Sequence, residues 1–119
     1  MARILVVDDE PAQRFLLRRI FERAGHEVTD AGDGAAALRA VRASPPDLVV
    51  TDMMMPVMGG RELIQQLRRE PATAGIPVLA ASGDPQFAVG ADAVVAKPYT
   101  WQHLTEVADG LLREGRGVL

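Results

Sequence analysis

Several residue types are missing or scarce in this chain of 119 residues. It has no cysteine, which excludes disulfide frameworks, thiolate metal sites and cysteine nucleophiles. Its longest apolar runs are a few residues, far short of the roughly 18 needed to span a bilayer. Acids interrupt the first apolar run too early for a signal peptide, and a net charge of -3 gives no electrostatic support for binding nucleic acid. We therefore expect one compact cytoplasmic domain, with no membrane and no nucleic-acid partner.

Lysine is also nearly absent. Of the 13 basic residues, all are arginine except Lys97. This is either a codon preference with one lysine left over, or a sign that an ammonium group is needed at that position.

Segments typical of strands alternate with segments typical of helices. Apolar and β-branched runs predict strands at residues 3–8, 26–31, 47–52, 77–81 and 93–96, and helical spacing predicts helices at residues 10–24, 33–43 and 61–70 and after Thr100. This alternation is typical of an α/β fold, a doubly wound five-stranded parallel sheet. The runs at 4–7 and 48–50 are wholly apolar and belong in the centre of the sheet, whereas the polar segment at 26–31 belongs at an edge, which favours the flavodoxin-like strand order 2-1-3-4-5.

The first helix offers detailed local predictions. Pro11 suits its first turn, Asp9 is a plausible N-cap and Gly25 should end it. We expect the buried face of this helix to consist of Leu16, Leu17, Ile20, Phe21 and Ala24.

The fourth strand–helix unit is unusually short. Only residues 82–91 separate the fourth predicted strand from the fifth, whereas a parallel crossover needs a dozen residues or more. We therefore expect the fourth helix to be reduced to about one turn or replaced by a loop.

Five polar side chains follow the ends of four predicted strands. Asp8 and Asp9 follow the first, Asp52 ends the third, Ser82 the fourth and Lys97 the fifth. Each alone is weak evidence, because a single Asp or Ser after a strand is more often a cap or a turn residue. Together they meet at the sheet edge where parallel sheets bind ligands.

The chemistry of these groups is consistent. Clustered carboxylates repel one another and attract a hard cation, for which Mg²⁺ is the natural candidate without cysteine or paired histidines. Asp52 would then act as a nucleophile towards a phosphoryl group. Lys97 and the hydroxyl of Ser82 would hold the added oxygens.

Four stretches of the sequence carry a family resemblance. They read ILVVDDEP at 4–11, DLVVTDMMMPVMGG at 47–60, PVLAAS at 77–82 and AKPYT at 96–100. In these motifs the chain resembles the receiver domain of two-component response regulators, the CheY-like proteins. The likeness covers nearly all of residues 1–119, with 114–119 expected to be a frayed tail.

The resemblance implies a signalling domain rather than an enzyme. It implies that Asp52 accepts a phosphoryl group from a histidine kinase or a histidine phosphotransfer protein, and that the domain assists its own phosphorylation and dephosphorylation. The implied Mg²⁺ ligands are Asp8, Asp9, Asp52 and the backbone carbonyl of Met54. Ser82 and Lys97 are implied as the switch pair, Met54 and Asp84 as residues that tune the lifetime of the phosphate, and the bond before Pro98 as cis.

The chain also departs from the family. Val94 stands where many members have an aromatic switch residue, and Tyr99 and Phe87 are candidates to replace it. We expect a stand-alone single-domain regulator, the alternative being the receiver of a longer protein cut after the tail. Phosphorylation-dependent dimerisation is compatible with the family. Its downstream target is not specified by the sequence.

Two other functions remain open at this stage. One is a protein-interaction module on the same fold that works independently of phosphorylation, and the other is a Mg²⁺-dependent phosphohydrolase. The remaining conspicuous residues have ordinary explanations. We interpret His26 and His103 as surface residues and Met53, Met54 and Met55 as packing residues. Arg14, Arg18 and Arg19 are interpreted as a solvated helix face, with part of a kinase-docking surface as the alternative. Trp101 is either a packing residue or an anchor for a partner.

Overall fold

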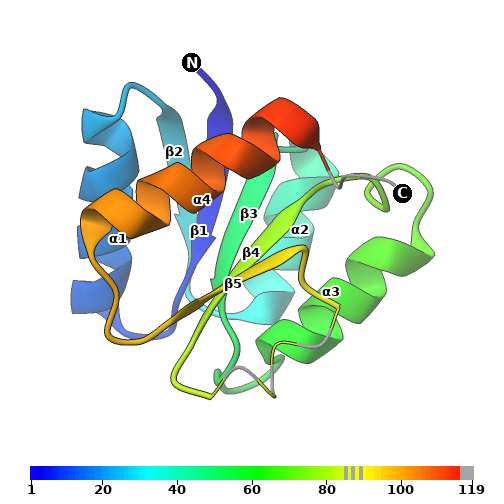
Figure 1. Cartoon of the computed structure of the whole chain (residues 1–119). Helices are drawn as coiled ribbons and strands as arrows, with labels where there is room; N and C mark the ends of the chain where they lie inside the picture. The colour runs from blue at the N-terminus through cyan, green and yellow to red at the C-terminus, as the bar shows by residue number, and fades with distance from the viewer. Residues whose placement is uncertain (85, 87, 89, 116–119) are drawn as a thin grey trace.

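The computed structural model describes residues 1–84, 86, 88 and 90–115. Nine elements follow one another in the order β1 (Arg3–Val7), α1 (Pro11–Arg23), β2 (Glu27–Ala31), α2 (Gly34–Ala43), β3 (Leu48–Asp52), α3 (Gly60–Arg69), β4 (Val78–Ser82), β5 (Ala93–Ala96) and α4 (Trp101–Glu114). The strands form one parallel sheet in the order β2-β1-β3-β4-β5 (Figure 1). The predicted fold class and strand order are confirmed.

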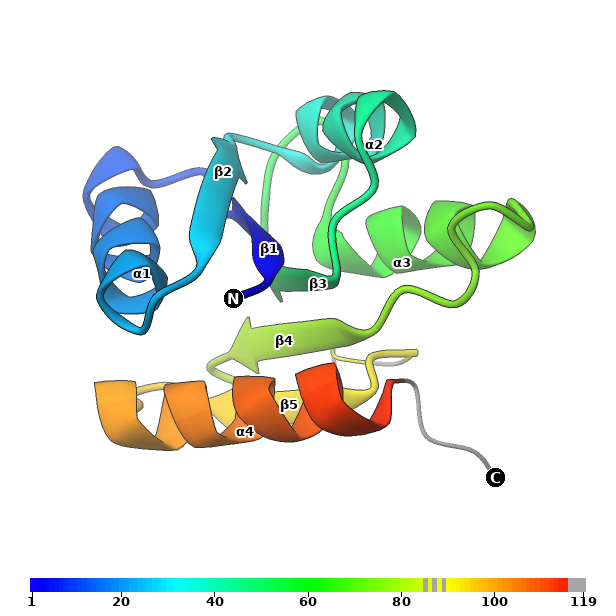
Figure 2. The same ribbon diagram turned by 90° about the horizontal axis from the view of Figure 1, so that it is seen from above.

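Helices cover both faces of the sheet, as Figure 2 shows from above. Helices α1 and α4 lie on one face, where Leu17, Phe21 and Leu104 pack against side chains of the central strands. Helices α2 and α3 cover the other face, where Leu38 and Leu67 belong to the other core cluster. Burial of these apolar side chains, worth about 1.5–3 kcal/mol each, stabilises the layers.

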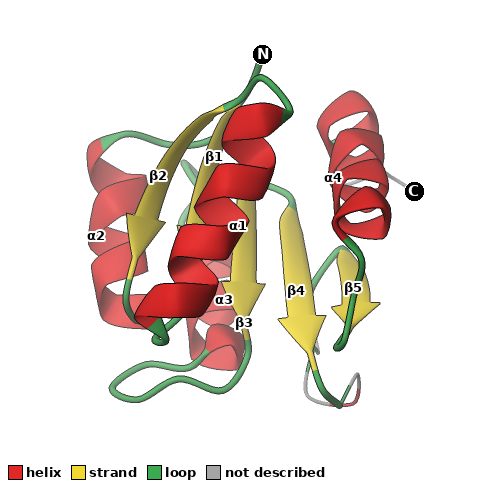
Figure 3. Ribbon diagram, turned by 90° about the vertical axis from the view of Figure 1, so that its left-hand side faces the viewer, coloured by secondary structure: helices red, strands yellow, loops and turns green. Residues whose placement is uncertain are grey.

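All five strands point the same way, so their carboxyl ends gather at one edge (Figure 3). In the described part of the chain, no helix is both long enough and apolar enough to cross a membrane.

The connection from β4 to β5 contains no α-helix among its described residues, which confirms the prediction of a reduced fourth helix. A polar brace holds this short crossover. Arg68 of α3 donates to a carboxylate oxygen of Asp92 at 2.8 Å and to the carbonyl of Ile76 at 2.8 Å. The same Asp92 oxygen accepts the backbone N–H of Val78, so one carboxylate joins α3, β4 and the start of β5.

Two predictions for α1 are wrong. Glu10 is the N-cap residue, without a side-chain bond, and Asp8 accepts the backbone N–H of Glu10 at 2.9 Å. The side chain that stabilises this turn is therefore that of Asp8, the acid nearer the strand, and Asp9 is exposed. Leu16 is 48% exposed and Ala24 is also exposed, because the helix buries the i, i+4 stripe of Leu17 and Phe21, with Ile20 partly buried beside it. Pro11 and Gly25 lie as expected, the latter with φ of 93°.

Candidate functional site

Strand register brings Asp8 and Asp52 to the same level of the sheet. Val7 pairs with Thr51 across the neighbouring strands β1 and β3. Asp8 follows Val7 and Asp52 follows Thr51, so the two aspartates lie side by side. Asp9 follows directly on β1. Each of the three acids can offer a carboxylate oxygen such that all three atoms lie within 4.8 Å of one another.

The three carboxylates differ in exposure. Asp8 is only 2% exposed, Asp52 is half-buried and Asp9 is exposed. Burial raises the pKa of Asp8, and the negative charges of Asp52 and Asp9 raise it further, while the Glu10 N–H and the Lys97 ammonium oppose this pKa shift. The charged form of Asp8 is therefore disfavoured in the folded protein, chiefly by burial, and a bound cation would favour it.

The donor set fits a hard divalent cation. It consists of carboxylate oxygens, and none of its members is a histidine. Oxygen ligands of this kind suit Mg²⁺, which keeps several waters and binds one or two carboxylates in addition to phosphate oxygens.

Lys97 is the cation paired with this cluster. Its ammonium nitrogen lies 3.4 Å from Oδ1 of Asp52. Its backbone N–H donates to the carbonyl of Ser82 at 3.0 Å, which ties the end of β5 to the end of β4. The bond between Lys97 and Pro98 is cis, the isomer that the family resemblance implies.

The two oxygens of Asp52 are in different environments. Oδ1 accepts the N–H of Met53 at 2.8 Å and that of Met54 at 3.4 Å, in addition to its ion pair. Within the described part of the chain, Oδ2 accepts no hydrogen bond. One oxygen is thus held in place while the other keeps its lone pairs available.

Ser82 is buried, but its hydroxyl takes part in a local turn. It donates to the carbonyl of Asp84 at 2.7 Å and accepts the Asp84 N–H at 3.1 Å. The carboxylate of Asp84 accepts the N–H of Gln86. The Met54 side chain is 69% exposed. Of the five strand-end groups, four are therefore clustered, and the fifth is adjacent with its hydroxyl engaged elsewhere.

Two residues near the cluster were missed or left open by sequence reasoning. Arg14 is half-buried and donates to the backbone carbonyl of Asp8 at 2.8 Å, so its interpretation as part of a solvated face is wrong. Nothing in the helical pattern separates it from the neighbouring arginines.

Tyr99 has a buried hydroxyl without a hydrogen-bond partner among the described residues. Burial raises the pKa of Tyr99, and the charges of Asp8 and Asp52 raise it further. Phe87 lies outside the described residues.

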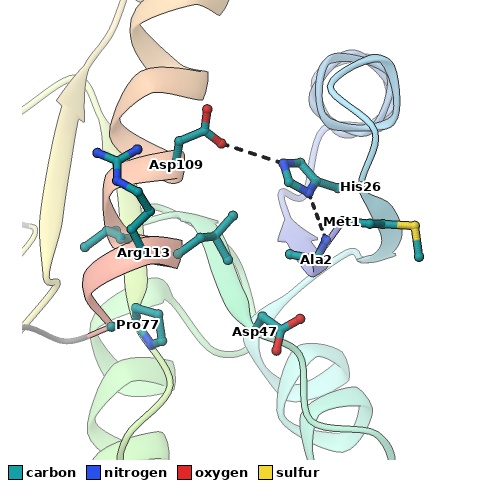
Figure 4. Close-up of a pocket in the computed structure, with 10 residues that line it drawn as sticks. Met1, Ala2, His26, Asp47, Pro77, Asp109 and Arg113 are labelled. Carbon is teal, nitrogen blue, oxygen red and sulfur yellow. Dashed lines mark hydrogen bonds and ion pairs between the residues drawn. The ribbon is translucent and has the colours of Figure 1, made fainter.

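A surface cavity of about 540 Å³ lies at the opposite edge of the sheet (Figure 4). His26 lines it, accepting the Ala2 N–H through Nδ1 at 3.1 Å and lying 3.8 Å from the Asp109 carboxylate through Nε2. The interpretation of His26 as a plain surface residue is therefore wrong, because its ring joins the amino terminus to α4. His103 is exposed, as expected.

The fold and the acidic cluster together define a class of protein: a doubly wound α/β domain with clustered carboxylates at the carboxyl ends of its strands. Comparison with known proteins gives the family. Residues 4–109 match the response regulator receiver domain, and the chain belongs to this family of two-component signalling proteins.

Individual relatives agree with this assignment. The chain is 39% identical to the transcriptional activator protein PfeR of Pseudomonas aeruginosa over 96% of its own length and 39% of that protein. It is 32% identical to the receiver domain of a signal transduction histidine kinase from Syntrophus aciditrophicus, with a TM-score of 0.88 over 95% of this chain and 91% of the other. For the chemotaxis response regulator CheY4 of Vibrio cholerae the identity is 30%, the TM-score 0.87, and the shares 93% and 98%.

The chain spans half or less of the length of the first curated relatives that it matches. Receiver domains are signalling domains that histidine kinases phosphorylate, and they typically bind Mg²⁺ at an acidic site.

Proposed function

We propose that this receiver domain accepts a phosphoryl group on Asp52, in a Mg²⁺-dependent transfer from the phosphohistidine of a kinase or of a histidine phosphotransfer protein. The observation that carries the proposal is the surroundings of Asp52. A positive group lies 3.4 Å from one of its oxygens, and two further carboxylates lie within 4.8 Å. This combination suits phosphoryl transfer, where positioning and charge stabilisation supply most of the catalysis.

The transfer step follows from the two oxygens of Asp52. Oδ1 stays fixed by backbone N–H groups while Oδ2 attacks phosphorus, forming the new O–P bond. The N–P bond of the phosphohistidine breaks, and its electron pair remains on the departing imidazole. The Lys97 ammonium would pair with the negatively charged oxygens of the phosphoryl group once it is attached to Asp52.

Asp8, Asp9 and Asp52 would hold the metal, together with the backbone carbonyl of Met54. When bound, Mg²⁺ neutralises charge on the phosphoryl oxygens and on the carboxylates around them. Asp8 has a further task, because its carboxylate also fixes the turn into α1 through the Glu10 N–H.

Ser82 would act as the responding group. Its hydroxyl donates to the carbonyl of Asp84 in the unmodified protein. A phosphoryl oxygen is a stronger, charged acceptor, so we expect the hydroxyl to exchange partners after transfer. That exchange would release the turn at Asp84 and change the surface after β4, which is the signal a binding partner can read. Met54 and Asp84 flank this region and are proposed to tune the lifetime of the phosphate.

The test is incubation with acetyl phosphate and Mg²⁺, followed by intact mass. We expect one phosphoryl group per chain, lost in Asp52→Asn and kept in the matched control Asp33→Asn, which retains a capping side chain at the start of α2. An unmodified wild type, or an adduct that survives Asp52→Asn, contradicts the proposal. Steady turnover of a generic phosphomonoester would point to a phosphohydrolase instead.

A further inference from the structure

A groove of about 530 Å³ lies between α1 and α4, the two helices that pack against the same core cluster. Each helix lines it with side chains spaced by one turn. These are Leu16, Ile20 and Ala24 on α1, and Trp101, Thr105 and Asp109 on α4. The volume lies within the range of sites that bind small molecules in proteins. The phosphoacceptor mechanism above uses none of these side chains.

The groove leaves large apolar side chains in contact with water. Trp101 is 60% exposed, Leu16 is 48% exposed, and Ile20 is only partly buried. The hydroxyl of Thr105 donates within its own helix, to the carbonyl of Trp101 at 3.0 Å, and this contact occupies its only proton. Covering apolar surface of this kind is favourable, so these residues favour a ligand with an apolar body.

Two guanidinium groups flank the apolar side chains. Arg19 and Arg23 line the groove one turn apart, both are exposed, and neither forms an ion pair among the described residues. Arg19 lies over the ring of Phe15 at 6.0 Å, a contact that holds the group without neutralising it. The carboxylate of Asp109 is directed towards His26 and lies 3.8 Å from its Nε2 (Figure 4). The lining of the groove is therefore positive, in a chain whose net charge is -3.

We propose that this groove binds a small amphipathic carboxylate, which is an aliphatic or aromatic body that ends in one carboxylate group. The apolar body lies against Leu16 and Trp101, and the carboxylate pairs with Arg19 or Arg23. A guanidinium matches a carboxylate through two parallel N–H donors, which a hydroxyl or an ammonium on the ligand does not satisfy. The site is separate from the acidic cluster, and the proposal does not depend on phosphotransfer to Asp52.

Trp101 reports on the groove directly, because it lines the groove and is the sole tryptophan of the chain. Decanoate serves as the probe, titrated below its micelle concentration while tryptophan emission is recorded. We expect saturable binding with a dissociation constant on the order of 0.1 mM, and emission that shifts to shorter wavelength as the indole ring is covered. Octanoate should bind about fivefold more weakly, because two methylene groups are lost.

The charge of the probe distinguishes this site from non-specific apolar binding. Decylammonium has the same chain length with the opposite charge, and decanol is neutral. Because the whole chain is negative, non-specific attraction would favour the cation. The groove should instead bind decanoate about tenfold more tightly than either of the other probes, and added salt should reduce this preference.

Substitution of the two arginines tests where the carboxylate lies. The double variant Arg19→Gln with Arg23→Gln should bind decanoate about tenfold more weakly and should bind decanol as the wild type does, which also shows that the groove is intact. The matched control is Arg69→Gln, at an exposed position of α3, which should leave decanoate binding unchanged.

Three outcomes overturn the proposal. They are a wild type whose emission does not respond at ten times the expected dissociation constant, equal affinity for decanoate and decylammonium, and a double variant that binds decanoate as tightly as the wild type. The first two need no substitution and are decisive whether or not the variant folds. Binding to phosphatidylglycerol vesicles without binding to monomeric decanoate would mean that this face contacts a lipid surface, and it would overturn the proposal as well.

Discussion

Replacing Asp8 by asparagine tests whether repulsion among the three carboxylates lowers the stability of the folded protein. In the folded protein Asp8 is 2% exposed, and its carboxylate lies beside those of Asp9 and Asp52. Two carboxylates at about 4.8 Å repel by about 3.5 kcal/mol at an effective dielectric constant near 20. Lys97 offsets part of this repulsion. An asparagine still accepts the Glu10 N–H through its carbonyl oxygen, so the turn survives.

Without metal at neutral pH, Asp8→Asn should therefore raise the free energy of unfolding by about 1–3 kcal/mol, which corresponds to a rise in Tm of about 4–12 °C for a chain of this size. The pH dependence has a definite sign. A carboxyl whose folded pKa is raised destabilises the fold when it ionises, so the advantage of the variant is complete above that pKa. It disappears as pH falls below the unfolded value near 3.8.

Magnesium should narrow this difference in stability. Wild type binds the ion in its folded form and gains about 1.4 kcal/mol at ten times the dissociation constant, while the variant has lost a ligand and gains less. The assay is thermal unfolding by circular dichroism with and without Mg²⁺, with Asp33→Asn as a control that should follow the wild type. A variant less stable than wild type in metal-free buffer at neutral pH, or equal stabilisation of both proteins by Mg²⁺, would refute the reasoning.

Three further predictions concern single side chains. Lys97→Ala should slow phosphorylation by acetyl phosphate at least tenfold, as measured by intact mass against time. Lys97→Arg should recover only part of the rate, because a planar guanidinium group replaces the compact ammonium group. Arg68→Ala should lower the free energy of unfolding by about 2–4 kcal/mol in urea titrations, since it leaves the carboxylate of Asp92 buried without its cation, and an equal loss in Arg69→Ala would argue against this. Tyr99→Phe should be neutral or stabilising by up to about 1 kcal/mol without metal, because it removes a buried hydroxyl that has no partner among the described residues; a clear loss of stability would mean that the hydroxyl is bonded.

The fold could be predicted from the sequence because its strand and helix segments are distinct in pattern. The buried runs at Ile4–Val7 and Leu48–Val50 mark central strands, and the polar segment at β2 marks an edge. Ten residues between β4 and β5 are too few for a full crossover helix, and that arithmetic needs no coordinates. Because the carboxyl ends of parallel strands lie at one edge of the sheet, the sequence also predicts that Asp8, Asp9 and Asp52 cluster there.

Side-chain choices within the turns could not be predicted in the same way. Asp8 and Asp9 are chemically equal as capping residues, so their residue type does not predict that Asp8 accepts the Glu10 N–H. The Ser82 hydroxyl can bond a neighbouring backbone group or a ligand, and in the unmodified protein the nearby carbonyl of Asp84 is its partner. His26 contacts Asp109 across 83 positions of sequence, a distance at which pattern carries no signal.

The central claim is that Asp52, and neither of its acidic neighbours, receives the phosphoryl group. The most direct measurement is to phosphorylate the protein with acetyl phosphate and Mg²⁺, reduce the acyl phosphate with borohydride, and locate the reduced residue by peptide mass spectrometry. The account predicts reduction at Asp52 alone, and none when the metal is chelated. Reduction at Asp8 or Asp9 in the wild type, or at no residue, would contradict it.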